Sequence, residues 1–91
     1  MVEITEGSFV YSAAGRDTGG LFVILEIGDG YAYLCDGRLR KTDRAKKKKL
    51  KHIKPAGGMN EALAEKIKNG EKLTNPEVRR AIAAYAASLE E

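Results

Sequence analysis

Short apolar runs separated by glycine-containing turns dominate the first sixty positions of the chain. The longest run, residues 21–27 (LFVILEI), is rich in β-branched side chains and too short for a confident helix. Its alternation gives a strand with two apolar faces, one bearing Leu21 and Val23 and the other bearing Phe22 and Ile24. Both faces therefore need cover. The pattern as a whole predicts five strands, at residues 8–12, 21–27, 31–35, 38–41 and 50–54.

The turn signals between these runs indicate how the strands connect. Asp36-Gly37 is typical of a two-residue hairpin, because a type I′ turn needs positive φ at both central positions. Pro55 is expected to end the last strand, and Gly57-Gly58 is the one plausible hinge. Five short strands joined by tight turns predict a small antiparallel barrel, because closure removes exposed sheet edges.

Helix formers take over after the glycine pair. Asn60 can cap a short helix over residues 61–68 that Gly70 would end. A longer helix is expected to follow, with Asn75 as its cap and Pro76 at its first position. Its apolar side chains recur at spacings of 4, 3 and 4 and form one stripe: Val78, Ile82, Tyr85 and Leu89.

The apolar stripe must pack against another apolar surface, and the central strand has one. We expect both helices to pack on the barrel over the face bearing Phe22 and Ile24. The predicted fold class is therefore α+β and mainly β: a five-stranded barrel over residues 1–56, followed by a helical extension over residues 57–91 in the same compact unit.

Composition excludes several classes of protein. The chain has 91 residues, 43% of them apolar, which suits one small domain. No apolar run approaches the roughly 20 residues that span a bilayer, and the acidic N-terminus lacks the features of a secretory signal, so we expect a cytoplasmic protein. A single cysteine, Cys35, and a single histidine, His52, cannot supply a disulfide or a four-ligand zinc site.

No arrangement of residues suggests catalysis. The sequence lacks a nucleophile paired with a base, closely spaced carboxylates and the Lys-Ser/Thr of a phosphate-binding loop. We therefore expect no enzymatic activity, no cofactor and no metal.

Charge is distributed very unevenly, although the formal net charge is only +3. Residues 38–54 hold ten bases and one acid, whereas the segments before and after this block are both net acidic. The four lysines of residues 46–49 repel one another, and Leu39, Leu50 and Ile53 beside them are expected to be anchored. These details favour a phosphate-binding surface over a solvated loop. Its candidate contacts are Arg38, Arg40, Lys41, Arg44, Lys46, Lys47, Lys48, Lys49, Lys51, His52 and Lys54.

Residues 7–24, GSFVYSAAGRDTGGLFVI, resemble a KOW motif of the form Gly-x-x-Val-x-Ser-x-Ala-Gly-Arg-Asp-x-Gly-x-x-Phe-Val-Val. The continuation through residues 36–41 (DGRLRK) and 46–53 (KKKKLKHI) is similar to bacterial KOW-domain proteins related to archaeal and eukaryotic large-subunit ribosomal proteins. The resemblance covers roughly residues 7–54. It implies an SH3-like barrel that binds RNA of the large ribosomal subunit, with ribosomal proteins as further expected partners. We expect a monomer with no membrane contact.

The loop of the motif combines glycines with charge. Gly15 and Gly19 allow positive φ or a close approach of the backbone to RNA. Arg16 either contacts RNA or pairs with Asp17 or Asp36, and both interpretations stay open. The carboxylate of Asp17 is expected to accept backbone N–H bonds within the turn.

Aromatic side chains are the second element of RNA recognition, because they stack on unpaired bases. Tyr31 and Tyr33 share one face of a strand and could either stack on bases or pack, whereas Tyr11 is expected to pack. Phe22 stands where many KOW motifs have a further glycine, so we expect it to pack in the core or on a helix. Cys35 is expected to fill space in the core.

Two other functions compete with RNA binding. The helix stripe could dock on a protein partner instead of on the barrel, and the location of the stripe distinguishes these cases. DNA binding is the other alternative, because neutralising phosphates does not separate DNA from RNA.

Overall fold

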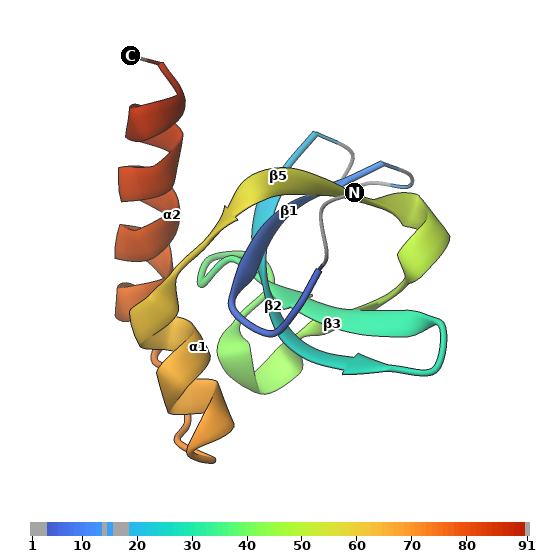
Figure 1. Cartoon of the computed structure of the whole chain (residues 1–91), viewed down its shortest axis with the longest axis horizontal. Helices are drawn as coiled ribbons and strands as arrows, with labels where there is room; N and C mark the ends of the chain where they lie inside the picture. The colour runs from blue at the N-terminus through green and yellow to red at the C-terminus, as the bar shows by residue number, and fades with distance from the viewer. Residues whose placement is uncertain (1–3, 14, 16–18, 91) are drawn as a thin grey trace.

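The computed structural model describes residues 4–13, 15 and 19–90, and it has five strands and two α-helices (Figure 1). The strands are β1 (Ser8–Ser12), β2 (Leu21–Gly28), β3 (Tyr31–Cys35), β4 (Lys46–Lys49) and β5 (Ile53–Met59). Two 3₁₀ turns, η1 (Thr42–Arg44) and η2 (Leu50–His52), flank β4, and the helices are α1 (Glu61–Lys68) and α2 (Asn75–Leu89).

All strand pairs are antiparallel, and the sheet has the order β4-β3-β2-β1-β5. Figure 1 shows a strongly curved sheet with both helices on one side of it. The predicted α+β class, with five antiparallel strands followed by two helices, is confirmed.

The predicted strand at residues 38–41 is wrong, because the fourth strand is formed by the lysines of residues 46–49. The Asp36 carboxylate accepts hydrogen bonds from the backbone N–H groups of Arg38 and Arg40, both at 2.9 Å. The N–H of Asp36 in turn donates to the Arg40 carbonyl at 2.9 Å. These bonds close a compact loop in place of the predicted two-residue hairpin, and they use backbone groups that a strand needs for pairing.

The fifth strand also differs from its prediction. Residues 50–52 form a 3₁₀ turn, and β5 then continues beyond residue 56 to Met59, opposite Ser8. Pro55 lies inside the strand, opposite Val10, instead of ending it. An outer strand tolerates proline, because one of its sides needs no N–H donor. Gly57-Gly58, the expected hinge, belongs to the same strand.

Two apolar clusters stabilise the molecule. The strand cluster is formed by strand residues alone: Val10, Phe22, Ile24, Ala32, Leu34 and Ile53. The helix cluster joins the sheet to the helices and comprises Phe9, Val23, Cys35, Leu63, Leu73 and Val78. The second cluster makes the helices part of the core of the sheet and not a detached appendage.

The helices cover the opposite face of β2 from the one predicted. Val23 contacts the helix cluster, whereas Phe22 and Ile24 are buried among the strands. Because the sheet curves, the strands themselves cover that second face. Simple alternation from Val23 would place Ile27 on the same face as Val23. Because the pairing register shifts between Ile24 and Glu26, Ile27 packs against the strand cluster instead.

The first helix has the ends that the sequence predicts. The Asn60 side chain accepts a hydrogen bond from the Leu63 N–H at 2.9 Å, as a cap does. Gly70 follows with φ +76°, the left-handed conformation that terminates helices.

The second helix is capped by Thr74 and not by Asn75 as predicted. The Thr74 hydroxyl accepts from the Glu77 N–H at 3.3 Å, and the Glu77 carboxylate accepts from the Thr74 N–H at 2.6 Å. This reciprocal pair satisfies two otherwise unpaired N–H groups. Asn75 instead accepts a hydrogen bond from the Thr42 N–H at 2.8 Å and so fixes η1 to the start of α2.

We expect Glu77→Gln to lower stability at neutral pH only. The Lys66 ammonium group, 2.5 Å from the carboxylate, and the Thr74 N–H hold the pKa of Glu77 below its ordinary value of 4.5. A lowered pKa stabilises the folded state above the unfolded pKa and loses this effect as the pH falls through the folded pKa. Urea unfolding should show a loss of about 0.5–1 kcal/mol at pH 7 that shrinks steadily below pH 4.5. Glu71→Gln, at an exposed position, is the control; a Glu77 effect that is equal at pH 7 and pH 3 would contradict the account.

The stripe on α2 is used within the molecule. Val78 is fully buried, and Ile82 and Tyr85 pack against the helix cluster. The Tyr85 ring stacks on Phe9 with a centroid distance of 4.2 Å, and its hydroxyl donates to the Ala56 carbonyl at 2.7 Å. The last member, Leu89, is half exposed.

Cys35 fills space in the helix cluster, as predicted. Burial, with a smaller effect of the Asp36 charge, raises the pKa of its thiol to about 12. Because the thiolate is the reactive form, we expect iodoacetamide at pH 8 to modify the folded protein on the order of 1000-fold more slowly than the urea-unfolded chain. Mass spectrometry measures both rates, and similar rates would show that Cys35 is accessible.

Candidate nucleic-acid interface

The lysine run divides between the two faces of β4. Lys47 and Lys49 lie opposite Tyr33 and Tyr31 of β3, and both lysines are exposed. Side chains alternate along a strand, so these two lysines share a face with the tyrosines. They form the basic and aromatic face of the β3–β4 hairpin.

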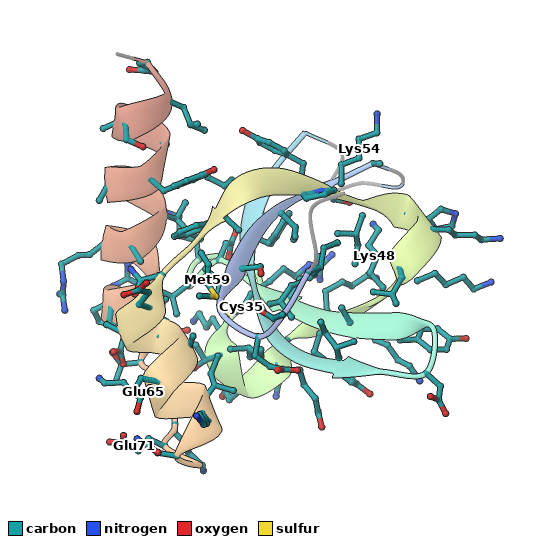
Figure 2. All side chains as sticks on the ribbon, in the orientation of Figure 1. Cys35, Lys48, Lys54, Met59, Glu65 and Glu71 are labelled. Carbon is teal, nitrogen blue, oxygen red and sulfur yellow. The ribbon has the colours of Figure 1, made fainter. Side chains whose placement is uncertain are left out.

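The other two lysines lie on the face of the strand cluster. Lys46 and Lys48 are opposite Leu34 and Ala32, which are both buried. Lys46 is exposed, but Lys48 is only 9% exposed. Its ammonium nitrogen would lie 3.3 Å from a Cβ atom at Gly15, and Figure 2 shows its side chain on the inner side of the curved sheet. The four lysines therefore have different environments, and Lys48 lies against Gly15, the first residue of the motif loop (residues 15–19).

Three segments that are separate in the sequence meet at this end of the sheet. Lys48 brings β4 to Gly15, and the Ala13 N–H donates to the His52 carbonyl at 2.8 Å, which brings η2 to the residues just before Gly15. The Leu50 N–H donates to the Gly30 carbonyl at 2.9 Å and joins η2 to the β2–β3 turn. The expected phosphate-binding segment and the motif loop are thus neighbours in the fold.

The glycines of the motif loop have positive φ, one of the two roles that the sequence left open for them. Gly15 and Gly19 have φ values of +83° and +87°, and both are exposed. A Cβ atom at Gly19 would meet no described atom within 4 Å, so bare backbone faces outward there. Arg16 and Asp17, which the sequence places between these glycines, lie outside the described residues.

The remaining bases of the segment surround the hairpin. Arg38, Lys41, Arg44, Lys51 and Lys54 are exposed, whereas Arg40 and His52 are half-buried. Figure 2 shows Lys54 projecting outward from β5. The expectation that three apolar residues anchor this segment holds only in part. Ile53 is buried and Leu50 packs against the strand cluster, but Leu39 is 86% exposed and anchors nothing.

The loop before β4 is instead fixed by polar contacts with α2. The Arg79 guanidinium donates to the Gly37 carbonyl at 2.6 Å, and Thr42 is bonded to Asn75 as described above. Gly37 itself is buried against the first turn of the helix. Sequence patterns alone missed this attachment, because its two hydrogen bonds join positions 42 and 33 residues apart. The burial of Gly37, which is unusual for a glycine in a turn, becomes evident only in the folded structure.

The position of β4 gives the lysines a structural role as well. Within the described sheet β4 pairs only with β3, so it is an outer strand. Lysines on an outer strand oppose pairing with strands of other molecules. The lysines at this edge therefore hinder pairing of the sheet with other molecules, whether or not they also bind an anion.

Tyr31 has a cation directly over its ring. The ammonium nitrogen of Lys47 lies 4.4 Å from the ring centroid, within the range of a cation–π contact. The Tyr31 residue is 36% exposed, and Tyr33 and Tyr11 are half-buried.

Neither a metal-ligand cluster nor a helix that could span a membrane occurs among the described residues. Among residues 4–13, 15 and 19–90, no three histidine, cysteine or acidic side chains are grouped so that they could hold a metal ion. The helices described here include none that is long and apolar enough to cross a bilayer.

Comparisons with known proteins leave the family open. Models of known protein families give no match to this chain, and neither do the curated proteins. The resemblance to the KOW motif therefore depends on the residues quoted above.

Proposed function

We propose that this chain is a non-enzymatic RNA-binding protein whose target is RNA of the large ribosomal subunit. The observation that carries the proposal is the meeting of β4, η2 and the glycine-bracketed motif loop at one end of the sheet. The two sequence segments that resemble KOW proteins thereby contribute to a single surface. The curved five-stranded antiparallel sheet also supports the SH3-like barrel that the resemblance implies.

Electrostatics supports an anionic partner. The segment 38–54 holds ten bases and a single acid, Asp43, and most of its basic side chains are exposed. Such a concentration of positive charge attracts polyanions and releases their counterions on binding. We propose contacts between phosphates and Lys46, Lys47, Lys49 and Lys51, with Arg38, Lys41, Arg44 and Lys54 at the margins of the surface.

Three candidates are less exposed than the other bases of this surface. Half-buried Arg40 and His52 would contact RNA through the part of each side chain that reaches the surface. Lys48, beside the motif loop, would act mainly by holding that loop next to β4. RNA of the large subunit would be met in the cytoplasm, beside ribosomal proteins.

The structure offers less support for a protein-docking role. Three of the four stripe residues of α2 pack on the chain's own sheet, and only Leu89 is half exposed. The distinctive surface that remains is the basic one.

The test is co-sedimentation of the tagged protein with separated ribosomal subunits at low and high salt. We expect retention on the large subunit that free messenger-sized RNA and duplex DNA do not displace, and that weakens with rising salt. Failure to bind either subunit, RNA or DNA at low salt would contradict the proposal. Equal displacement by RNA and duplex DNA would indicate a general nucleic-acid binder instead.

A further inference from the structure

The outer face of β3 passes from the core to solvent along the strand. Tyr31, Tyr33 and Cys35 alternate on this face. Cys35 is fully buried in the helix cluster, Tyr33 is half-buried and Tyr31 is 36% exposed. The cover provided by the helices therefore ends before the β2–β3 turn, and two aromatic side chains remain at the uncovered end.

The neighbours of Tyr31 leave its surroundings open on one side and basic on the other. On β2 its partner is Gly28, where a Cβ atom would meet no described atom within 4 Å. On β4 its partner is Lys49, and the ammonium group of Lys47 lies over its ring. An aromatic ring thus lies between an empty flank and two exposed cations.

Tyr33 has a similar arrangement, but with an acid on the β2 side. It pairs with Glu26 on β2 and with Lys47 on β4. The negative charge of Glu26 repels phosphate, whereas Lys47 attracts it. A nucleic-acid backbone on this face would therefore run along β4, with its bases over the tyrosines.

A ligand that suits this face must combine a planar group with a nearby negative charge. Nucleotides have both, because a base can stack on an aromatic ring while its phosphate meets a lysine. Bases inside a duplex are already stacked on each other, so only unpaired nucleotides can use the ring. An acidic peptide would use the lysines but would gain little from the tyrosine ring.

We propose that the face formed by Tyr31, Tyr33, Lys47 and Lys49 binds unpaired RNA bases by stacking. This inference rests on the proposed RNA binding and specifies its substrate class as a single-stranded segment or loop. Tyr31 is the main stacking residue, and Lys47 and Lys49 contact the flanking phosphates.

The experiment compares the full chain with its Tyr31→Ala and Tyr31→Phe variants. Fluorescence anisotropy measures the affinity of each for an unstructured RNA oligonucleotide and for an RNA duplex of equal length. We expect Tyr31→Ala to weaken single-strand binding about 5- to 150-fold and to leave duplex binding unchanged. Tyr31→Phe retains the ring and should stay within about twofold of the unaltered chain. Circular dichroism verifies that both variants fold.

A second control separates stacking from charge. Lys51→Ala removes an exposed cation from η2 and should weaken single-strand and duplex binding to a similar degree. Suppose that the unaltered chain binds RNA, but Tyr31→Ala either leaves the single-strand affinity unchanged or weakens the binding of both RNAs equally. The proposal of base stacking is then wrong, and the proposal of RNA binding stands. If the unaltered chain binds neither RNA, both proposals are wrong.

Discussion

Replacing Gly37 by alanine is expected to lower the free energy of unfolding by about 3 kcal/mol. Gly37 has φ +77°, a conformation that alanine adopts with strain. In addition, an alanine Cβ would lie 2.5 Å from the carbonyl oxygen of Asn75 and 2.9 Å from Cγ of Arg79. The Asn75 carbonyl belongs to the backbone of α2 and cannot rotate away, so the loop or the helix must move.

Gly30 provides a matched control for this substitution. Its φ of +76° is nearly the same, but a Cβ atom there would meet no described atom within 4 Å. Gly30→Ala should therefore lose only the backbone contribution, about 1 kcal/mol. Urea unfolding of both variants measures the difference. Equal losses would mean that the loop around Gly37 does not rest on α2.

The contact at Gly37 also concerns the proposed RNA surface. The Arg79 guanidinium donates to the Gly37 carbonyl, and this bond fixes the loop that carries Arg38 and Lys41. A loop held in place loses less conformational freedom when RNA binds. The helices thus contribute to function by positioning bases, in addition to covering the sheet.

The second large effect concerns the exposed lysines of β4. We expect Lys46→Ser, Lys47→Ser and Lys49→Ser together to reduce the slope of log affinity against log salt by roughly 2, because each lost phosphate contact removes about 0.7. Relative to binding near 1 M salt, this corresponds to on the order of 100-fold weaker RNA binding at 0.1 M salt. Fluorescence anisotropy with an RNA oligonucleotide at four salt concentrations gives both quantities.

The control removes the same number of charges elsewhere. Lys68, Lys72 and Arg80 are exposed residues of the helical part, outside the proposed surface. Their joint replacement by serine changes the net charge equally but should leave the salt slope nearly unchanged. Similar slopes for the two triple variants would show that β4 makes no specific phosphate contact. Lys48 is kept in both, because it is buried and its loss would disturb the motif loop.

Local sequence signals were sufficient where neighbouring turn or capping residues set the bounds of an element. The strand over residues 31–35 and the helix over 61–68 have the predicted bounds, since turn glycines and a capping asparagine delimit them. The strand over 38–41 failed, because the Asp36 carboxylate closes a loop that charge alternation around Leu39 does not reveal. The lysines of β4 become a strand through pairing with β3, although four lysines have little tendency to form one.

In the candidate site, too, features that depend on the fold could not be predicted from the sequence. The block of positive charge could be predicted, because it depends on residue type alone, and positive φ was one of two expected roles for Gly15 and Gly19. The different environments of Lys47 and Lys48 could not, because they depend on the register between β3 and β4. The choice of helix-covered face failed for a related reason, since only the curvature of the sheet decides which side of β2 the strands cover.

The most direct test of RNA binding by this surface is a titration of the ¹⁵N-labelled chain with an unstructured RNA oligonucleotide, followed by amide chemical shifts. A protein of 91 residues gives resolved spectra. We predict the largest shifts at Tyr31, Tyr33, β4, η2 and Gly19, with small shifts in the second half of α2. Shifts concentrated on α2, or no shifts at low salt, would contradict the account.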